Sequence, residues 1–131
     1  MGACYNAELH IGFEDKADEE KALAKLQEFV HSDRANFQRD DWAKDGIGTD
    51  ALQDIFKILL SSQQGYFTAE ADGQWQDYEN DFDASYGWEG VLIDMFELIT
   101  PYLKNGSKFY LDCDDDYDEF IVDNGECVQL H

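Results

Sequence analysis

Residues 66–82 read YFTAEADGQWQDYENDF, and this stretch decides the fold class. Two segments with strand character, 66–71 and 74–82, lie on either side of Asp72-Gly73. This dipeptide accepts the positive φ angles of a tight two-residue turn, which joins antiparallel neighbours. The sequence therefore predicts a β-hairpin here and a mainly antiparallel sheet.

Further strands are expected at both ends of the chain. Downstream, segments 108–113, 118–122 and 126–130 form a predicted meander, whose last two strands are joined across Asp123-Asn124-Gly125. Upstream, residues 4–13 alternate apolar and polar side chains, as an opening strand does.

Three segments have helical periodicity. The first extends over about 15–31, the second is expected to begin at the N-cap Asp50 with Gln53 three residues on, and the third is expected to run from a cap at Ser85 to Pro101. The predicted apolar faces are Ala22, Leu23, Leu26, Phe29 and Val30 for the first helix, Leu52, Ile55, Phe56, Leu59 and Leu60 for the second, and Trp88, Val91, Leu92, Met95, Phe96 and Ile99 for the third.

The element order is thus β-α-α-ββ-α-βββ, which indicates an α+β fold in a single domain over residues 1–131. We expect a mainly antiparallel sheet of about five to six strands, with the three amphipathic helices packed on one face. Residues 32–48 are expected to form an irregular connection anchored by Phe37 and Trp42. The second face of the sheet is then left in water.

The charge of the chain is unevenly distributed. Residues 1–57 carry a net charge of −6 and residues 58–131 carry −15, of a total of −21. Such self-repulsion opposes a compact state, whereas 44% hydrophobic and 15% aromatic residues exclude disorder. A positively charged partner is therefore expected. Between Lys57 and Lys104 the chain has no basic residue, and its nine carboxylates there are Glu70, Asp72, Asp77, Glu79, Asp81, Asp83, Glu89, Asp94 and Glu97.

Two acidic segments have the alternation of strands, in which every second residue shares a face. Asp77, Glu79, Asp81 and Asp83 form the first predicted stripe, opposite Tyr78 and Phe82. The second predicted stripe is Asp112, Asp114, Asp116 and Asp118, with Phe109, Leu111 and Cys113 pointing inward. Charges in one stripe lie about 6.8 Å apart. Phosphates of one DNA strand follow every ~3.4 Å, so adjacent stripes would be needed to imitate a backbone.

This pattern leads to the hypothesis of a non-catalytic decoy that binds the basic nucleic-acid-binding surface of a nuclease or of a CRISPR or restriction effector. In composition alone, the chain is similar to phage-encoded anti-restriction and anti-CRISPR proteins and to immunity proteins. The expected contact residues are Asp77, Glu79, Asp81, Asp83, Asp112, Asp114, Asp115, Asp116, Asp118, Trp75 and Tyr78. If they are exposed, Trp75, Tyr78 and the nearby Tyr86 could serve as aromatic anchors for the partner.

Several alternatives remain open at this point. An immunity protein for a nuclease toxin would use the same electrostatics, whereas a small metal-binding protein or enzyme would use clustered carboxylates. The acidic surface could also serve solubility alone or adaptation to high salt. Direct nucleic-acid binding is disfavoured by charge, and no apolar run is long enough to cross a membrane.

Motifs for chemistry are lacking. The segment 112–118 fails as an EF-hand because Tyr117 and Asp123 stand where glycine and glutamate are required. His10, His31 and His131 have no partner at zinc-ligand spacing. We expect no cofactor, no metal and no catalysis. Cys4, Cys113 and Cys127 are expected to be reduced in a cytoplasmic protein, which would be a monomer or a homodimer. Cys113 and Cys127 could lie near each other across neighbouring strands, but a disulfide between them is not expected.

Overall fold

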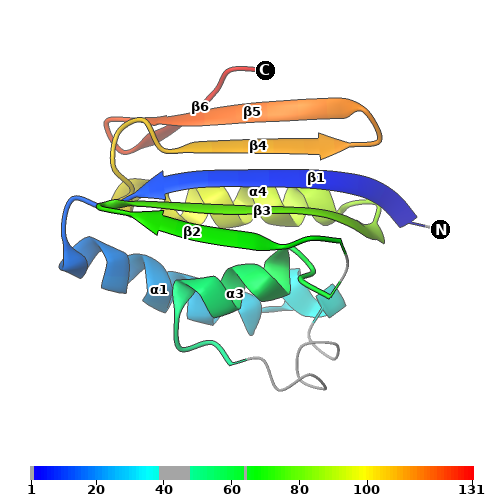
Figure 1. The fold of residues 1–131 in the computed structure, drawn as a ribbon, viewed down its shortest axis with the longest axis horizontal. Helices are drawn as coiled ribbons and strands as arrows, with labels where there is room; N and C mark the ends of the chain where they lie inside the picture. Colours follow the sequence, from blue (N-terminus) through cyan, green and yellow to red (C-terminus); the bar gives the residue numbers. More distant parts are fainter. Residues whose placement is uncertain (1, 39–47, 64) are drawn as a thin grey trace.

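The computed structural model describes residues 2–38, 48–63 and 65–131. The expectations for Trp42 and for the side chain of Phe37 lie outside the described residues. Six strands form one sheet in the order β2-β3-β1-β4-β5-β6, with every neighbouring pair antiparallel (Figure 1). The strands are β1 (Gly2–Gly12), β2 (Thr68–Asp72), β3 (Trp75–Ser85), β4 (Lys108–Cys113), β5 (Asp116–Asp123) and β6 (Glu126–Gln129).

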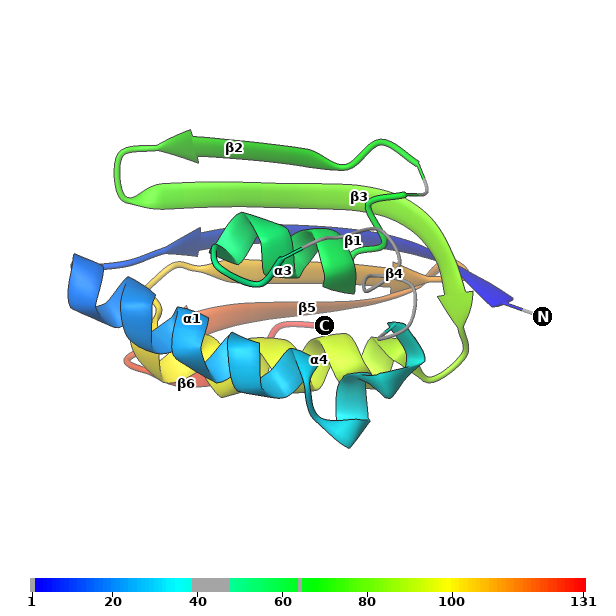
Figure 2. The ribbon, with the colours of Figure 1, turned by 90° about the horizontal axis from the view of Figure 1, so that it is seen from below.

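Three α-helices of the described residues gather on one side of this sheet (Figure 2). They are α1 (Lys16–Val30), α3 (Leu52–Leu59) and α4 (Trp88–Ile99), and two 3-10 helices, η1 (Asp33–Gln38) and η2 (Thr100–Tyr102), follow α1 and α4. The α+β fold class and the order of strands and α-helices are therefore confirmed.

The predicted apolar faces of α3 and α4 are buried in full. Phe96 of α4 packs against the sheet, with its ring centroid 5.3 Å from that of Phe109 and 6.4 Å from that of Phe120. Trp88 of α4 is also buried, and its indole N–H donates to the carbonyl of Leu59 at 3.0 Å. These contacts join α3, α4 and the sheet into one core.

Two predicted helix caps are wrong. The N-cap of α3 is Ala51, not Asp50, and no side chain caps this helix. Ser85 is the last residue of β3 because it still pairs with Gly2 of β1. The chain then turns into α4 through Gly87, whose φ of 99° is accessible to glycine.

Two of the three hairpin turns differ from expectation. The β2–β3 turn is Gly73-Gln74, one residue later than predicted, and only its glycine has a positive φ. The β5–β6 turn uses Asn124-Gly125, as expected. The β4–β5 turn is Asp114-Asp115, where φ is 51° and 74°. Aspartate tolerates this left-handed conformation better than most residues do.

Alternation along the strands separates a core-facing side from a solvent-facing side. On β1, for example, Tyr5, Leu9 and Ile11 are buried, whereas Glu8 between them is exposed. We call the solvent-facing side of the sheet, opposite the three helices, the open face.

The packing of α4 against the sheet can be tested by substitution. Phe96→Ala removes the ring that packs against Phe109 and Phe120 and should lower the free energy of unfolding by about 3–5 kcal/mol. Glu97→Ala, an exposed neighbour on the same helix, should change it by less than about 0.5 kcal/mol. Urea unfolding measures both values. Equal effects of the two substitutions would contradict the described packing of α4.

Candidate protein-docking face

The first predicted acidic stripe lies on the open face. Glu79, Asp81 and Asp83 of β3 are exposed and Asp77 is half-buried, whereas Tyr78 and Phe82 are 5% exposed on the core side. The placement of this stripe is confirmed. Tyr78, however, cannot be an exposed anchor for a partner. Its burial and the nearby charge of Glu19 raise the pKa of its hydroxyl to about 12.

Neighbouring strands extend this stripe into a broader acidic surface. In β1, Glu8 is the direct partner of Glu79, and in β2, Glu70 is the direct partner of Asp77. We call this surface the acidic half of the open face. Its residues are Glu8, Glu70, Asp77, Glu79, Asp81 and Asp83.

The second predicted stripe does not exist as one row. Asp112 lies on the open face, where it pairs with Asn6 of β1. The two-residue turn after β4 reverses the chain, so Asp116 and Asp118 pair with the core-side residues Cys113 and Leu111. Asp116 and Asp118 therefore lie on the side opposite to Asp112, where Asp118 accepts a hydrogen bond from Gln129.

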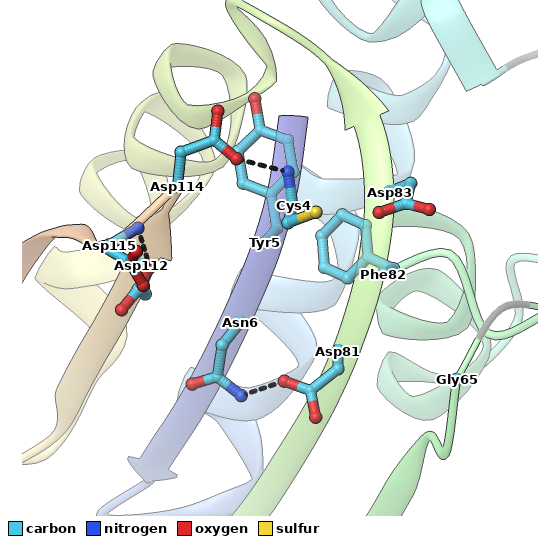
Figure 3. A pocket seen from close by; sticks show the side chains of 10 residues that line it. All are labelled: Cys4, Tyr5, Asn6, Gly65, Asp81, Phe82, Asp83, Asp112, Asp114 and Asp115. Atoms are coloured by element: carbon cyan, nitrogen blue, oxygen red, sulfur yellow. Dashed lines mark hydrogen bonds between the residues drawn. The ribbon is translucent and has the colours of Figure 1, made fainter. Parts of the chain in front are cut away.

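The remaining acids do meet, in a groove of about 710 Å³ at one end of the open face (Figure 3). Only β1 separates β3 from β4, so their side chains are two strand spacings, about 10 Å, apart. The sequence left this adjacency undetermined. The carboxylates that line the groove are Asp81, Asp83, Asp112, Asp114 and Asp115.

Local hydrogen bonds hold the groove in place. Asp81 accepts a hydrogen bond from the Asn6 amide at 2.6 Å, and Asp114 accepts one from the backbone N–H of Cys4 at 2.9 Å. The exposed Tyr86 also donates to Asp114. These last two hydrogen bonds, that of Tyr86 above all, lower the pKa of Asp114, so its carboxylate stays ionised.

Cys4 lies in the same groove but is not arranged as a nucleophile. A hydrogen bond to Asp83 and the charge of that carboxylate raise the pKa of its thiol, and Asp114 and Asp115 add to the effect. Since the thiolate is the nucleophilic form of cysteine, these neighbouring carboxylates suppress the reactivity of Cys4. The groove therefore suits the binding of cations better than covalent chemistry.

The cysteines cannot form the pair considered from the sequence. Cys113 pairs with Asp116 at one end of β5, whereas Cys127 pairs with Val122 near the other end. The two cysteines are thus on β4 and β6, not on neighbouring strands, and are separated by about 20 Å along β5. All three cysteines are free thiols.

Few basic groups compensate the acids of the open face. Among the strand residues, which are all described, His10 and Lys108 are the basic side chains. The His10 ring nitrogen Nδ1 lies 2.6 Å from Asp77, and Trp75 stacks on this ring with 4.4 Å between centroids. Trp75 is thus half-buried beside the acidic half, with Lys104 Nζ 5.6 Å from its ring centroid.

The other half of the open face carries aromatic side chains. Tyr110 of β4 stacks on Tyr117 of β5 with 5.5 Å between ring centroids, and Tyr117 stacks on His131 with 4.0 Å. We call these three residues the aromatic ladder. Sequence reasoning missed it, although the alternation in 108–113 already placed Tyr110 on the same face as Asp112.

Glu8 and Glu79 are a like-charged pair at the centre of the face. Partial burial raises the pKa of the Glu8 carboxyl above its ordinary value of 4.5, and the charge of Glu79 and a hydrogen bond between the two groups raise it further. The pair therefore holds a proton more tightly than two separate carboxyls would. A cation placed between them would relieve this repulsion.

Replacing Glu8 with Gln should stabilise the fold at neutral pH. The folded state binds the Glu8 proton more tightly than the unfolded chain, so the stabilisation from this carboxyl is full below pH 4.5 and is lost as pH rises through the raised pKa. At pH 7, Glu8→Gln should raise the melting temperature by about 1–3 °C, as expected for relief of directly opposed like charges. The difference should shrink at pH 4.

Calorimetry of Glu119→Gln provides the matched control. Glu119 makes the same contribution to net charge, but its direct neighbour on β4 is Tyr110, not a carboxylate. Its substitution should move the melting temperature less than Glu8→Gln. Equal shifts for both variants would show that general repulsion, not the Glu8–Glu79 pair, accounts for the effect.

Within the described residues, no three His, Cys, Asp or Glu side chains are grouped so as to hold a metal ion. The described helices also include none long and apolar enough to span a membrane.

Comparison with protein-family models, with curated proteins and with solved structures found no match to this chain.

Proposed function

We propose that this protein is a non-catalytic inhibitor that binds the basic nucleic-acid-binding surface of another protein, a nuclease or a CRISPR or restriction effector of the kind that phage anti-defence proteins block. The observation that carries the proposal is the acidic half of the open face together with the groove at its end. These carboxylates share one surface, and among the strand residues only His10 and Lys108 are basic.

The density of charge on this surface supports imitation of a nucleic-acid backbone. Residues 77–83 of β3 extend over about 20 Å. Over this length the open face carries four carboxylates from β3, with Glu8 and Asp112 on the next two strands. One strand of DNA carries about six phosphates in the same distance. A groove that binds DNA would therefore meet a comparable number of negative charges.

The distribution of cations supports binding over mere solubility. Arg34 pairs with Asp94 at 2.7 Å and Lys16 with Glu19 at 3.5 Å, both on the helix side of the molecule. On the open face, Asp77 lies 2.6 Å from the ring nitrogen Nδ1 of His10. The negative field of the open face would steer a basic partner toward it.

The proposal also includes the place of action. We infer a cytoplasmic protein, because nucleic-acid-processing effectors act there and because the positions of Cys4, Cys113 and Cys127 in the sheet suit free thiols.

The proposal predicts that neutralising three carboxylates of the acidic half weakens the capture of a basic partner. The test variant is Glu79→Gln/Asp81→Asn/Asp83→Asn, which retains the side-chain shapes. Three exposed contacts at about 0.5 kcal/mol each correspond to a roughly tenfold loss of affinity. The matched control is Glu20→Gln/Glu28→Gln/Glu97→Gln, which removes the same charge from exposed helix positions and should bind normally.

The measurement is affinity capture from a lysate of the source cells, with mass spectrometry, followed by elution with added DNA or RNA. We expect nucleic-acid-binding proteins that the wild type and the control retain, that the test variant loses, and that nucleic acid or added salt displaces. A partner that binds the protein and nucleic acid at the same time would indicate an exosite, as for an immunity protein. Identical retention by the test variant and the wild type would contradict the proposal.

A further inference from the structure

The aromatic ladder is a second feature of the open face that a purely acidic surface does not need. Tyr117 is 39% exposed, and the ladder lies over β4 and β5, beside the acidic half. Exposed Val128 extends the apolar surface toward β6. Tyrosines at the centre of an interface commonly supply much of its binding energy.

The ladder meets the acids at a hollow of about 330 Å³. Tyr110 is the direct cross-strand partner of Glu8 on one side and of Glu119 on the other, and all three line the hollow. Glu79, the partner of Glu8, lines it as well. An aromatic ring is therefore bordered by carboxylates on both neighbouring strands.

An aromatic ring bordered by carboxylates favours arginine over lysine. The planar guanidinium of arginine stacks on an aromatic face while its N–H groups bind a carboxylate in a forked geometry. The ammonium of lysine is a compact, strongly hydrated charge that favours contact with carboxylate alone. Lys108 also lines the hollow, in the next register row beside His10, and makes no ion pair within 4 Å among the described residues.

A second copy of this chain is a poor occupant of the face. Each copy carries a net charge of −21, and the strands that build the face contribute only His10 and Lys108 as basic groups. Two such faces would repel each other. The complementary occupant is a cationic protein surface.

We propose that the open face selects arginine over lysine in its partner, with an arginine side chain stacked on Tyr110 and paired with the carboxylates of Glu8 and Glu79. The inference rests on the proposed function and specifies the chemistry of the basic surface that is bound. The acidic half supplies attraction for any cation, and the aromatic ladder supplies the discrimination.

Two labelled peptides of equal length and charge test the inference, nona-arginine and nona-lysine, with fluorescence anisotropy against the full chain at low salt. The wild type should bind the arginine peptide about two- to fivefold more tightly, as one exposed cation–π contact predicts. Tyr110→Leu and Tyr117→Leu should lower the affinity for arginine to that for lysine and leave lysine binding unchanged. Tyr110→Phe, which keeps the ring, should retain the preference.

The outcomes separate this inference from the proposed function. A preference that persists in both leucine variants would reflect carboxylate pairing alone and would overturn the role of the ladder. If the wild type binds both peptides equally and the Glu79→Gln/Asp81→Asn/Asp83→Asn variant binds neither, the preference for arginine is overturned. The proposed role of the acidic half in binding cations would still stand. Binding that survives this triple substitution would overturn both proposals. Melting temperatures near that of the wild type confirm that each variant is folded.

Discussion

The pairing of β1 with both β3 and β4 is the interaction on which the rest of the structure depends. β1 alternates without interruption, and its buried residues Tyr5, Leu9 and Ile11 hold one face against the helices. A register slip of one residue would exchange the two faces and bury carboxylates, so burial specifies the register strongly. This register brings Asp81 and Asp83 of β3 within two strand spacings of Asp112 of β4. Two acidic segments that are far apart in the chain thereby become one surface.

The energetic consequence is a fold whose core stabilises a self-repelling face. Phe96 and Trp88 are fully buried between helices and sheet, and their burial raises the free energy of unfolding. The repulsion between the opposed carboxyls of Glu8 and Glu79 lowers it. A guanidinium placed between these two carboxyls would relieve their repulsion. Relief of repulsion and attraction to the partner would then act in the same direction.

Under the proposed function, the open face would combine long-range and short-range recognition. Charge on the acidic half acts over about 8–10 Å in physiological salt and mainly accelerates encounter. The rings of Tyr110 and Tyr117 act only on contact, where stacking slows dissociation. Asp114 illustrates how the two are built together, because its hydrogen bonds to Tyr86 and Cys4 keep it ionised while they fix the rim of the groove. Under the proposed function, this combination would favour a specific protein partner over a simple polycation.

Much of the fold followed from local pattern, because alternation and helical periodicity act between near neighbours. The apolar faces of α3 and α4, the turn at Asn124-Gly125 and the stripe on β3 were all predictable on this basis. The caps at Asp50 and Ser85 were wrong because strand pairing and core packing outweighed local capping preference. The tertiary structure alone decided that Asp114-Asp115 forms a turn, which sends Asp116 and Asp118 to the core side, and that Tyr78 is buried. It also decided which strands are neighbours, because strand order depends on how distant segments share one core.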